Sequence, residues 1–365
     1  MVTRNEFEQQ VLDALRRPPG RQDLASRFLM SAPSFSRFVI GRNEQSAEVA
    51  ALIDLDGLVD DFAKKGGVWN GLKVLTSIQL PKDAVILNCS TSISPIDVNT
   101  RMGAQPIMGL LNINELIHAA SGGINWPKFV TDQRRDYQDH QGEWGGLFDR
   151  LEDDESKKTL SDILRYRLTA DAHYMSSYRV RLKEQYFEDF LGLRREVFVD
   201  AGGFDGDTTD EFCRRHPDYE KVLLFEPSGS NMAAAQVRLK KFRDIEFIQE
   251  GLSDCDGELS FDPDSGSASS VSSTSDKRIK VTTLDQAVKQ PVSFIKMDLE
   301  GWELKALSGC RGHILEDKPK LAISVYHSAS DFRAIPDFIL SLNPDYRVFL
   351  RHYTQGWSET VMFFV

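Results

Sequence analysis

The stretch that decides the fold is Val197-Phe198-Val199-Asp200-Ala201-Gly202-Gly203-Phe204-Asp205-Gly206. A short apolar run passes directly into a glycine-rich turn, and a helical pattern follows as far as Phe212. Glycine lets the backbone turn sharply and approach a ligand closely, where a Cβ atom would collide. The stretch therefore predicts a buried strand, a ligand-binding turn and a helix.

Short apolar runs continue on the C-terminal side, at residues 222–225, 245–248, 292–295 and 321–325. Continuous apolar strands that alternate with helices predict a parallel sheet covered on both faces, with ligands bound beyond the carboxyl ends of the strands. The last two runs, 346–350 and 360–365, are joined by a loop too short for a crossover helix. We expect an α/β domain with a mostly parallel, Rossmann-like sheet that ends in an antiparallel hairpin.

The N-terminal half predicts a smaller α/β domain, with strands at residues 37–41 and 83–89. Gly41 alone is not a Gly-x-Gly-x-x-Gly loop, so a scaffold or a substrate-selecting role is favoured over nucleotide binding. Residues 131–158 are polar and predict a surface connection, and the apolar stripe from Leu160 to Leu191 predicts one long helix. The expected organisation is a domain at 1–130, a linker and long helix at 131–195, and a second domain at 196–365.

Composition excludes several classes of protein. The 55 acidic and 44 basic residues give a formal charge of −11, which disfavours nucleic acid as a partner. The sequence has no apolar run of the ~20 residues that a membrane span requires and no secretion signal, so we expect a cytoplasmic protein without membrane association. The four cysteines are scattered and predict reduced thiols. The oligomeric state is left open.

The ends of the first two strands of the C-terminal domain predict a nucleoside site. Glu226, followed by Pro227, ends the second strand, where a carboxylate can accept hydrogen bonds from both ribose hydroxyls. Asp200, Asp205 and Asp207 lie in or beside the glycine turn and would repel a pyrophosphate. S-adenosylmethionine has no phosphate and carries an ammonium and a sulfonium, so the charges favour it over a dinucleotide.

Two further turns contribute polar groups at the same edge. The segment Leu252-Ser253-Asp254 follows the third strand, where an adenine would lie, and Asp298, Glu300 and Glu303 follow the fourth. The acids can line the cleft, or they can cap and begin a helix. They could also hold Mg²⁺ through oxygen ligands, but the helix roles explain them as well, and we predict no metal site.

Several of these segments resemble the FkbM family of S-adenosylmethionine-dependent methyltransferases, in order and from about residue 196 to 365. They are Asp200-Ala201-Gly202 with Gly206, Glu226-Pro227, Leu252-Ser253-Asp254, Thr283-Leu284-Asp285 and Lys296-Met297-Asp298-Leu299-Glu300-Gly301-Trp302-Glu303. The resemblance implies a class I methyltransferase sheet of seven strands and, usually, O-methylation of a hydroxyl on a sugar or natural product. The sequence departs from the family at Phe204, where many members have Asn.

The resemblance also implies which residues contact S-adenosylmethionine. Asp200, Gly202, Gly203 and Gly206 would line the methionine end. Glu226 and Pro227 would line the ribose. Leu252, Ser253 and Asp254 would line the adenine.

A hydroxyl acceptor needs a base to take its proton, and Asp298 and His327, which follow neighbouring predicted strands, are the candidates. The expected partner is a small-molecule or glycan acceptor. Two other functions stay open, namely a dinucleotide-dependent oxidoreductase and a non-catalytic binding protein with a methyltransferase-like fold.

Overall fold

The computed structural model describes residues 2–63, 67–262, 270–271 and 278–365. The chain forms two compact units. The first comprises Met1–Gln141, Lys158–Val180 and Thr354–Ser358, and the second comprises Gly142–Lys157, Arg181–Tyr353 and Glu359–Val365. The domain boundaries expected after residues 130 and 195 stay predictions.

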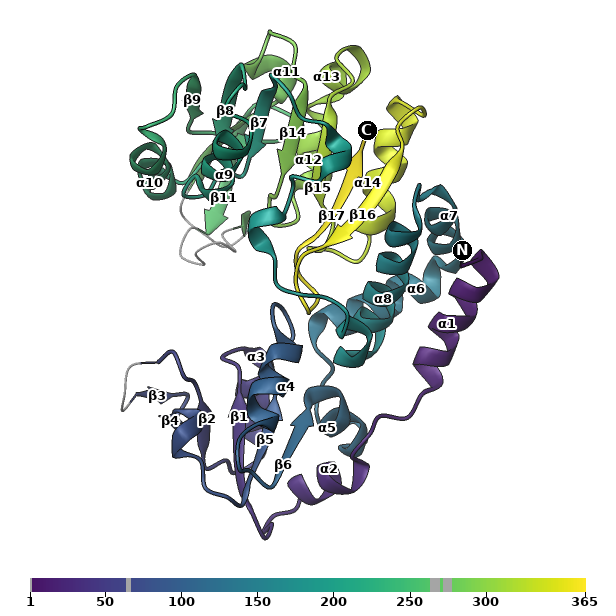
Figure 1. Ribbon diagram of the computed structural model, residues 1–365, viewed down its shortest axis with the longest axis vertical. Coiled ribbons are helices and arrows are strands. Elements are labelled where there is room, and N and C mark those ends of the chain that lie inside the picture. The colour runs from purple at the N-terminus through teal and green to yellow at the C-terminus, as the bar shows by residue number, and fades with distance from the viewer. Residues whose placement is uncertain (1, 64–66, 263–269, 272–277) are drawn as a thin grey trace. The chain divides into compact units, whose positions relative to one another are not determined.

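The second unit is built on a seven-stranded sheet with the order β16-β17-β15-β14-β7-β8-β9 (Figure 1). Its strands are β7 (Val197–Ala201), β8 (Lys221–Phe225), β9 (Ile245–Ile248), β14 (Phe294–Met297), β15 (Lys320–Ser324), β16 (Val348–His352) and β17 (Thr360–Phe364). All neighbouring pairs are parallel except those of β17, which runs antiparallel to both β15 and β16. The predicted Rossmann-like sheet with a terminal antiparallel hairpin is confirmed.

The helices of this unit pack in two groups, α9 with α10 and α13 with both α11 and α14, and α14 also contacts α12. Those after residue 196 are α9 (Asp207–Arg215), α10 (Gly229–Leu239), α11 (Leu284–Ala287), α12 (Glu303–Ser308), α13 (Arg311–Glu316) and α14 (Asp331–Leu342). The ring of Phe198 on β7 lies 4.3 Å from that of Phe212 on α9 and 4.9 Å from that of Phe294 on β14. Each of these fully buried rings contributes about 1.5–3 kcal/mol of hydrophobic stabilisation, which fixes β7, β14 and α9 relative to one another.

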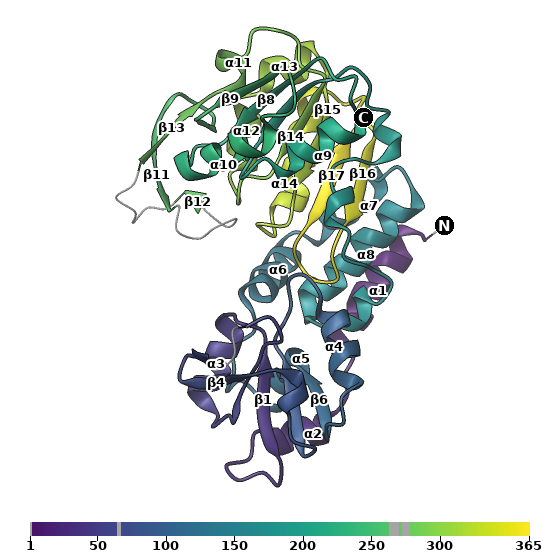
Figure 2. The ribbon, with the colours of Figure 1, turned by 60° about the vertical axis from the view of Figure 1, so that its left-hand side comes forward.

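A smaller sheet extends the second unit, with the order β10-β13-β11-β12 (Figure 2). Its strands are β10 (Gly251–Leu252), β11 (Gly257–Asp262), β12 (Ser270–Val271) and β13 (Arg278–Thr282). Most of the Ser/Gly-rich run between β11 and β13 lies outside the described residues.

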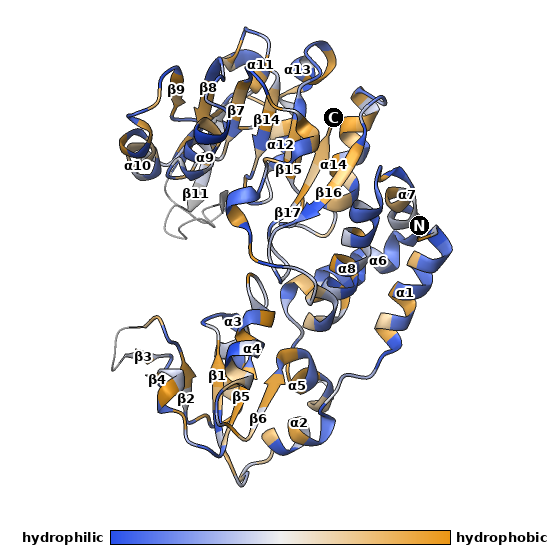
Figure 3. Cartoon of the chain, in the orientation of Figure 1, coloured by the Kyte–Doolittle hydropathy of each residue, from blue (hydrophilic) through white to orange (hydrophobic). Residues whose placement is uncertain are grey.

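The first unit contains a six-stranded sheet with the order β3-β4-β2-β1-β5-β6, in which only the β3–β4 pair is antiparallel. The strands are β1 (Ser36–Ile40), β2 (Gly57–Val59), β3 (Val68–Trp69), β4 (Leu72–Leu75), β5 (Ala84–Asn88) and β6 (Gly109–Asn112). The predicted strands at 37–41 and 83–89 are β1 and β5, and the four others escaped prediction because they are only two to four residues long. The central strands of the two large sheets, such as β1, β5 and β14, are strongly apolar (Figure 3).

The N-terminal helices are α1 (Arg4–Arg16), α2 (Gln22–Phe28), α3 (Glu44–Leu52), α4 (Pro95–Gly103) and α5 (Ile113–Ala119). The polar connection expected at 131–158 is wrong, because α6 (Lys128–Asp139) and α7 (Gln141–Arg150) occupy most of it and bury Tyr137, Trp144 and Phe148. The sequence of these helices is mostly charged, so their few large buried side chains gave no helical pattern.

The single long helix expected from Leu160 to Leu191 is also wrong. Helix α8 (Asp154–Thr169) ends where Ala170 adopts a left-handed φ of 51°, and the Asp171 side chain then accepts a hydrogen bond from the His173 backbone. Short 3₁₀ turns follow at Ala172–Met175, Leu182–Glu184 and Asp189–Leu191. Among the described residues, no helix is both long and apolar enough to span a bilayer.

Candidate active site

The glycine turn after β7 is held against the turn after β14. Gly202 has a φ of 79°, and a Cβ added to it would lie 2.0 Å from the backbone carbonyl oxygen of Asp298. The N–H groups of Gly202 and Gly203 both donate to the Phe225 carbonyl, at 3.0 and 2.9 Å. Gly206, with a φ of 82°, immediately precedes α9. Glycine is therefore required at Gly202 both by its conformation and by the close approach of the two turns.

Beneath this turn lies a buried ion pair. Lys296 Nζ is 3.1 Å from Asp200 Oδ1 and donates to the Gly202 carbonyl at 2.8 Å. The other Asp200 oxygen accepts from Thr209 Oγ1 at 2.7 Å. Burial lowers the pKa of Lys296, but Asp200, Asp298 and Asp207 together raise it more, and the net pKa lies above its ordinary value. Asp200 therefore supports the turn from below with a side chain that has no exposed surface.

The acidic rim expected from three carboxylates is thus weaker than the sequence indicated. Asp200 is paired with Lys296, and Asp205 forms an ion pair with Arg238. Asp207 begins α9, and burial raises its pKa. The sequence alone indicates three unscreened charges, because Lys296 and Arg238 come from segments far from the glycine turn.

Glu226, at the end of β8, faces the glycine turn. Its carboxylate accepts the backbone N–H of Phe204 at 3.0 Å and that of Ser228 at 2.9 Å. Burial raises the pKa of Glu226, although the two backbone donors oppose the shift. The carboxylate holds Phe204 in its left-handed conformation (φ 44°). Pro227 follows, next to Gly251, where an added Cβ would lie 3.8 Å from the proline Cγ.

Leu252 ends β10 in the smaller sheet, and Ser253 and Asp254 follow the strand and lie beside the segment that begins α12. Ser253 Oγ accepts a hydrogen bond from Trp302 Nε1 at 3.2 Å. Asp254 forms an exposed ion pair with Lys305 at 2.9 Å. The structure thus brings this predicted adenine segment close to the acidic turn that follows β14.

The acidic turn contains two residues with left-handed backbone, Glu300 (φ 52°) and Gly301 (φ 93°). Glu303 begins α12, and its Oε1 accepts the backbone N–H of Leu299 at 2.7 Å. The helix role that the sequence allowed for Glu303 is therefore present. Burial, with a contribution from Asp298, raises the pKa of Glu300 to about 7.

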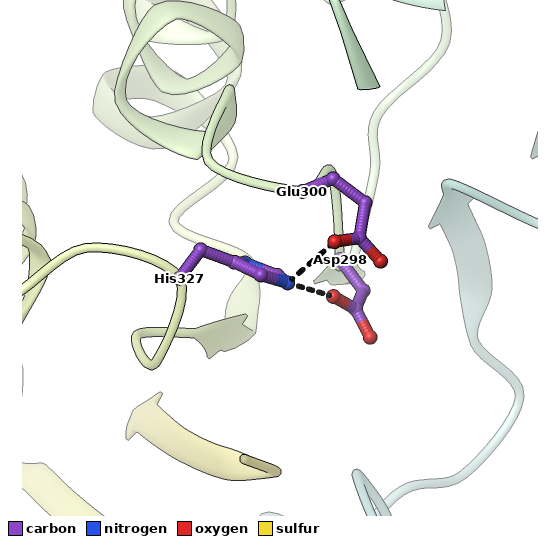
Figure 4. Close-up of side chains that lie close together, drawn as sticks. All are labelled: Asp298, Glu300 and His327. Carbon is purple, nitrogen blue, oxygen red and sulfur yellow. Dashed lines mark ion pairs between the residues drawn. The ribbon is translucent and has the colours of Figure 1, made fainter. Parts of the chain in front are cut away.

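His327, which follows β15, points into this turn (Figure 4). Its Nε2 lies 3.4 Å from both Asp298 Oδ1 and Glu300 Oε2, and its Nδ1 lies 3.0 Å from Glu303 Oε1. Burial lowers the pKa of His327, but Glu303 and the other two carboxylates raise it more, to about 10. At neutral pH the ring is then an imidazolium, which cannot accept a proton. This charge state argues against His327 as the base in the unliganded protein.

Sequence reasoning missed three groups that surround Asp298. Tyr186 donates its hydroxyl to Asp298 Oδ2 at 2.7 Å, and Gln185 Nε2 donates both to the Tyr186 oxygen and to Glu359 Oε2, at 2.9 and 2.8 Å. Burial, with a contribution from Asp298, raises the pKa of Glu359 to about 7. The sequence placed Tyr186 in a helical packing stripe, and no local pattern links it to Asp298.

Comparison with known proteins identifies this part of the chain. Residues 200–354 match the family model described as the methyltransferase FkbM domain. These residues are a methyltransferase FkbM domain. The resemblance inferred from the sequence is confirmed, and so is the methyltransferase class.

The similarity to one solved structure extends beyond the FkbM domain. The crystal structure of methyltransferase FkbM from Methylobacillus flagellatus KT is 25% identical, with a TM-score of 0.74, and the match covers 99% of this chain and 100% of that chain. The N-terminal half therefore also has a counterpart in that protein.

Two further structures resemble only part of the chain. An rRNA methylase from Streptococcus thermophilus is 18% identical, with a TM-score of 0.33, and the match covers 48% of this chain and 91% of that chain. A precorrin-6y C5,15-methyltransferase from Geobacter metallireducens GS-15 is 14% identical, with a TM-score of 0.31, over 48% and 82% of the two chains. These scores are too low to support an argument. No curated protein matches the sequence.

Proposed function

We propose that the FkbM domain transfers a methyl group from S-adenosylmethionine to a hydroxyl oxygen of a sugar, glycan or natural product. One observation carries the proposal, the direct contact between the glycine turn after β7 and the backbone of Asp298 after β14. A methyl donor held by the first turn would lie beside the carboxylate that follows the second strand. Fixing two reactants in this way removes several kcal/mol of the barrier.

The residues at this edge suit an adenosyl donor. Gly202, Gly203 and Gly206 would border its methionine part, with Asp200 holding the turn from below. Glu226 is buried next to the turn, with Pro227 beside it. Each of its two carboxylate oxygens can accept a hydrogen bond from a ribose hydroxyl. The segment Leu252-Ser253-Asp254 would face the adenine.

When bound, S-adenosylmethionine supplies a methyl group that leaves its sulfur as a C–O bond forms, and the electron pair of the broken S–C bond stays on the sulfur. Asp298 accepts the proton that the acceptor hydroxyl loses. Tyr186 holds the Asp298 carboxylate in place through its 2.7 Å hydrogen bond to Oδ2. His327 is the other base named from the sequence, and its neighbours favour a positioning role through Asp298 and Glu300.

We expect the acceptor to be a neutral or cationic small molecule or glycan, because the protein carries a net charge of −11, which also disfavours nucleic acid. We also propose a cytoplasmic location. Tyr353 has no exposed surface, so its ring cannot stack on a sugar of the acceptor.

Isothermal titration calorimetry of the full chain tests the donor. S-adenosylhomocysteine should bind with one site per chain, and NAD should not bind. Tight binding of NAD alone would overturn the proposal in favour of an oxidoreductase. Cofactor binding without transfer to any acceptor would favour a non-catalytic binding protein.

Methyl-labelled S-adenosylmethionine, incubated with a panel of glycans and natural-product alcohols, tests the reaction. Asp298→Asn should lower product formation by about 10²- to 10⁴-fold while leaving affinity for S-adenosylhomocysteine within about threefold. Asp244→Asn is the matched control, because Asp244 is exposed before β9 in a left-handed conformation (φ 54°) that Asn tolerates. Unchanged transfer by Asp298→Asn would reject it as the base.

A further inference from the structure

We propose that Asp298, Glu300 and His327 form a binding site for one divalent cation at the mouth of the FkbM domain. The inference deepens the proposed function, on which its catalytic meaning rests. From the sequence, the candidate ligands were Asp298, Glu300 and Glu303, and helix roles explained these acids without a metal. The structure adds the His327 imidazole to the cluster.

The three side chains already present one ligand atom each to a common point. These atoms all lie within 4.8 Å of one another, and His327 Nε2 is 3.4 Å from the nearest oxygen of each carboxylate. Ligands at ~2.1 Å from a metal and at right angles to one another are about 3 Å apart. Small rotations of the two partly exposed carboxylates would therefore complete one face of a coordination sphere.

The state of His327 is the second, independent observation. Its side chain is 8% exposed, and neither ring nitrogen has a hydrogen-bond partner, although both are aimed at carboxylate oxygens. The carboxylates balance a protonated ring by charge, but neither ring nitrogen is satisfied by a directed hydrogen bond, which calls for an explanation. A cation on Nε2 would satisfy the ring and balance the two carboxylates together, and it would displace any proton from that nitrogen.

Glu303 is placed as the outer partner that a metal-binding histidine uses. Its Oε1 lies 3.0 Å from His327 Nδ1, on the side of the ring opposite Nε2, and is itself fixed by the Leu299 N–H at 2.7 Å. Proteins commonly orient a metal-binding imidazole by a carboxylate on its other nitrogen. Glu303 would therefore be a positioning residue and not a ligand.

Local charge and backbone agree with this assignment. Lys296, two residues before Asp298, directs its ammonium to Asp200 and the Gly202 carbonyl and not to the acidic turn. Glu300 is held in a left-handed conformation, which non-glycine residues adopt at a cost and which brings its carboxylate next to Asp298. The strained backbone of Glu300 thus places two carboxylates, those of Asp298 and Glu300, close together.

The ligand set selects a class of cation. Carboxylate oxygens suit Mg²⁺, Ca²⁺ and Mn²⁺, whereas an imidazole nitrogen suits later transition metals. Mn²⁺ accepts both, so it is the probe of choice. The three protein ligands would leave positions open for the acceptor oxygen. With Asp298 Oδ1 on the cation, Oδ2 would be the oxygen that takes the acceptor proton in the proposed reaction.

The test uses the full chain, freed of metal by a chelator and then dialysed. Isothermal titration calorimetry with Mn²⁺, and loss of the electron paramagnetic resonance signal of free Mn²⁺, should both give one bound ion per chain. Glu300→Gln and His327→Gln should each weaken Mn²⁺ binding by at least tenfold, and Glu303→Gln by about 10- to 100-fold. Glu246→Gln, an exposed acid on β9, is the matched control and should stay within twofold.

Melting curves and S-adenosylhomocysteine titrations on the same samples separate the possible failures. Each variant should melt cooperatively and bind S-adenosylhomocysteine within about threefold of the parent chain. If S-adenosylhomocysteine binds and Mn²⁺ does not, the cation site is refuted and the proposed function stands. If Mn²⁺ binds one per chain and S-adenosylhomocysteine does not, the cation site stands and the proposed function fails. Equal Mn²⁺ affinity in the parent, Glu300→Gln and His327→Gln would also refute the site.

Discussion

Lys296 connects the two turns from which the candidate site is built. Its side chain is 3% exposed, and its ammonium contacts the Asp200 carboxylate on β7 and the carbonyl of Gly202. Because both charges are out of water, their pairing adds little net stability, but loss of one partner leaves the other uncompensated. The pair therefore keeps the register between β7 and β14 at the point where they end.

Replacement of Lys296 by Met should lower the free energy of unfolding by about 3–5 kcal/mol, because Asp200 would keep a buried, unpaired charge. Urea denaturation measures the change. Adding Asp200→Asn to this variant should restore part of the loss, because no buried charge then remains. A double variant less stable than the single one would contradict this account.

Tyr186 is expected to act through Asp298. Tyr186→Phe removes the hydroxyl that donates to Asp298 Oδ2 at 2.7 Å and should lower kcat by about tenfold, or about 1.4 kcal/mol, with little change in KM. Tyr346→Phe is the control, since the Tyr346 hydroxyl donates to the Pro319 carbonyl away from the site. A rise in KM at constant kcat would instead assign Tyr186 to acceptor binding.

Among the elements, the glycine turn has the least tolerance for change. Gly202→Ala places a Cβ 2.0 Å from the Asp298 carbonyl and forces a left-handed conformation on alanine. We expect a loss of several kcal/mol of stability, or displaced turns with at least tenfold weaker S-adenosylhomocysteine binding. Gly257→Ala is the control, because no atom lies within 4 Å of its added Cβ. Melting temperature and calorimetry measure both effects. If Gly202→Ala behaves like Gly257→Ala, the close contact between Gly202 and the Asp298 carbonyl is contradicted.

The start of α8 should respond to pH. Asp153 Oδ2 lies 2.6 Å from Arg351 Nη2 on β16, and its Oδ1 accepts the Ser156 N–H. Burial raises the pKa of Asp153, but hydrogen bonds from Arg351 and Ser156 lower it more, so the net pKa lies below its ordinary value. A carboxyl with a depressed folded-state pKa stabilises the protein above its unfolded pKa of about 3.9, and this contribution is lost as the pH falls.

Asp153→Asn should therefore cost about 1 kcal/mol at pH 7, allowing for partial exposure of the carboxylate, and this cost should shrink as the pH falls below about 4. Urea denaturation of both proteins across this pH range measures the difference. A cost that stays constant down to pH 3 would show that the charge of Asp153 is not involved.

The elements also show what sequence can predict. The seven strands of the large sheet and the glycine turn follow from local patterns, because they are short apolar runs or a cluster of conformationally special residues. The strands of the smaller sheet, β10 to β13, were not predicted, because they are short or polar. The pairing of Asp200 with Lys296 and of Tyr186 with Asp298 joins segments far apart in the chain, so the charge and hydrogen-bond balance of the site could not be read locally. The end of α8 before Ala170 could not be predicted either. Alanine favours helix, and the helix ends only because Ala170 adopts a left-handed conformation.

At the scale of the whole molecule, the second unit is assembled from segments that are discontinuous in sequence. Residues 142–157 and 181–195 belong to it, although the regular alternation of strands and helices begins only at 196. Trp144 packs on Phe332 with ring centroids 5.6 Å apart, Glu143 pairs with Arg333, and the Glu152 N–H donates to the Val348 carbonyl at 2.9 Å. The second segment supplies Tyr186.

This organisation predicts different behaviour for two fragments. The fragment 196–365 matches the domain predicted from the sequence but lacks Trp144, whose burial alone is worth about 3–5 kcal/mol by comparison with core substitutions. Since domains are stable by only about 5–15 kcal/mol, we expect this fragment to unfold without a cooperative transition. The fragment 142–365 keeps both segments and should unfold cooperatively in urea, followed by near-ultraviolet circular dichroism. Equal urea midpoints for the two fragments would show that residues 142–195 add nothing to the stability of the FkbM domain, and would support the boundary at 196.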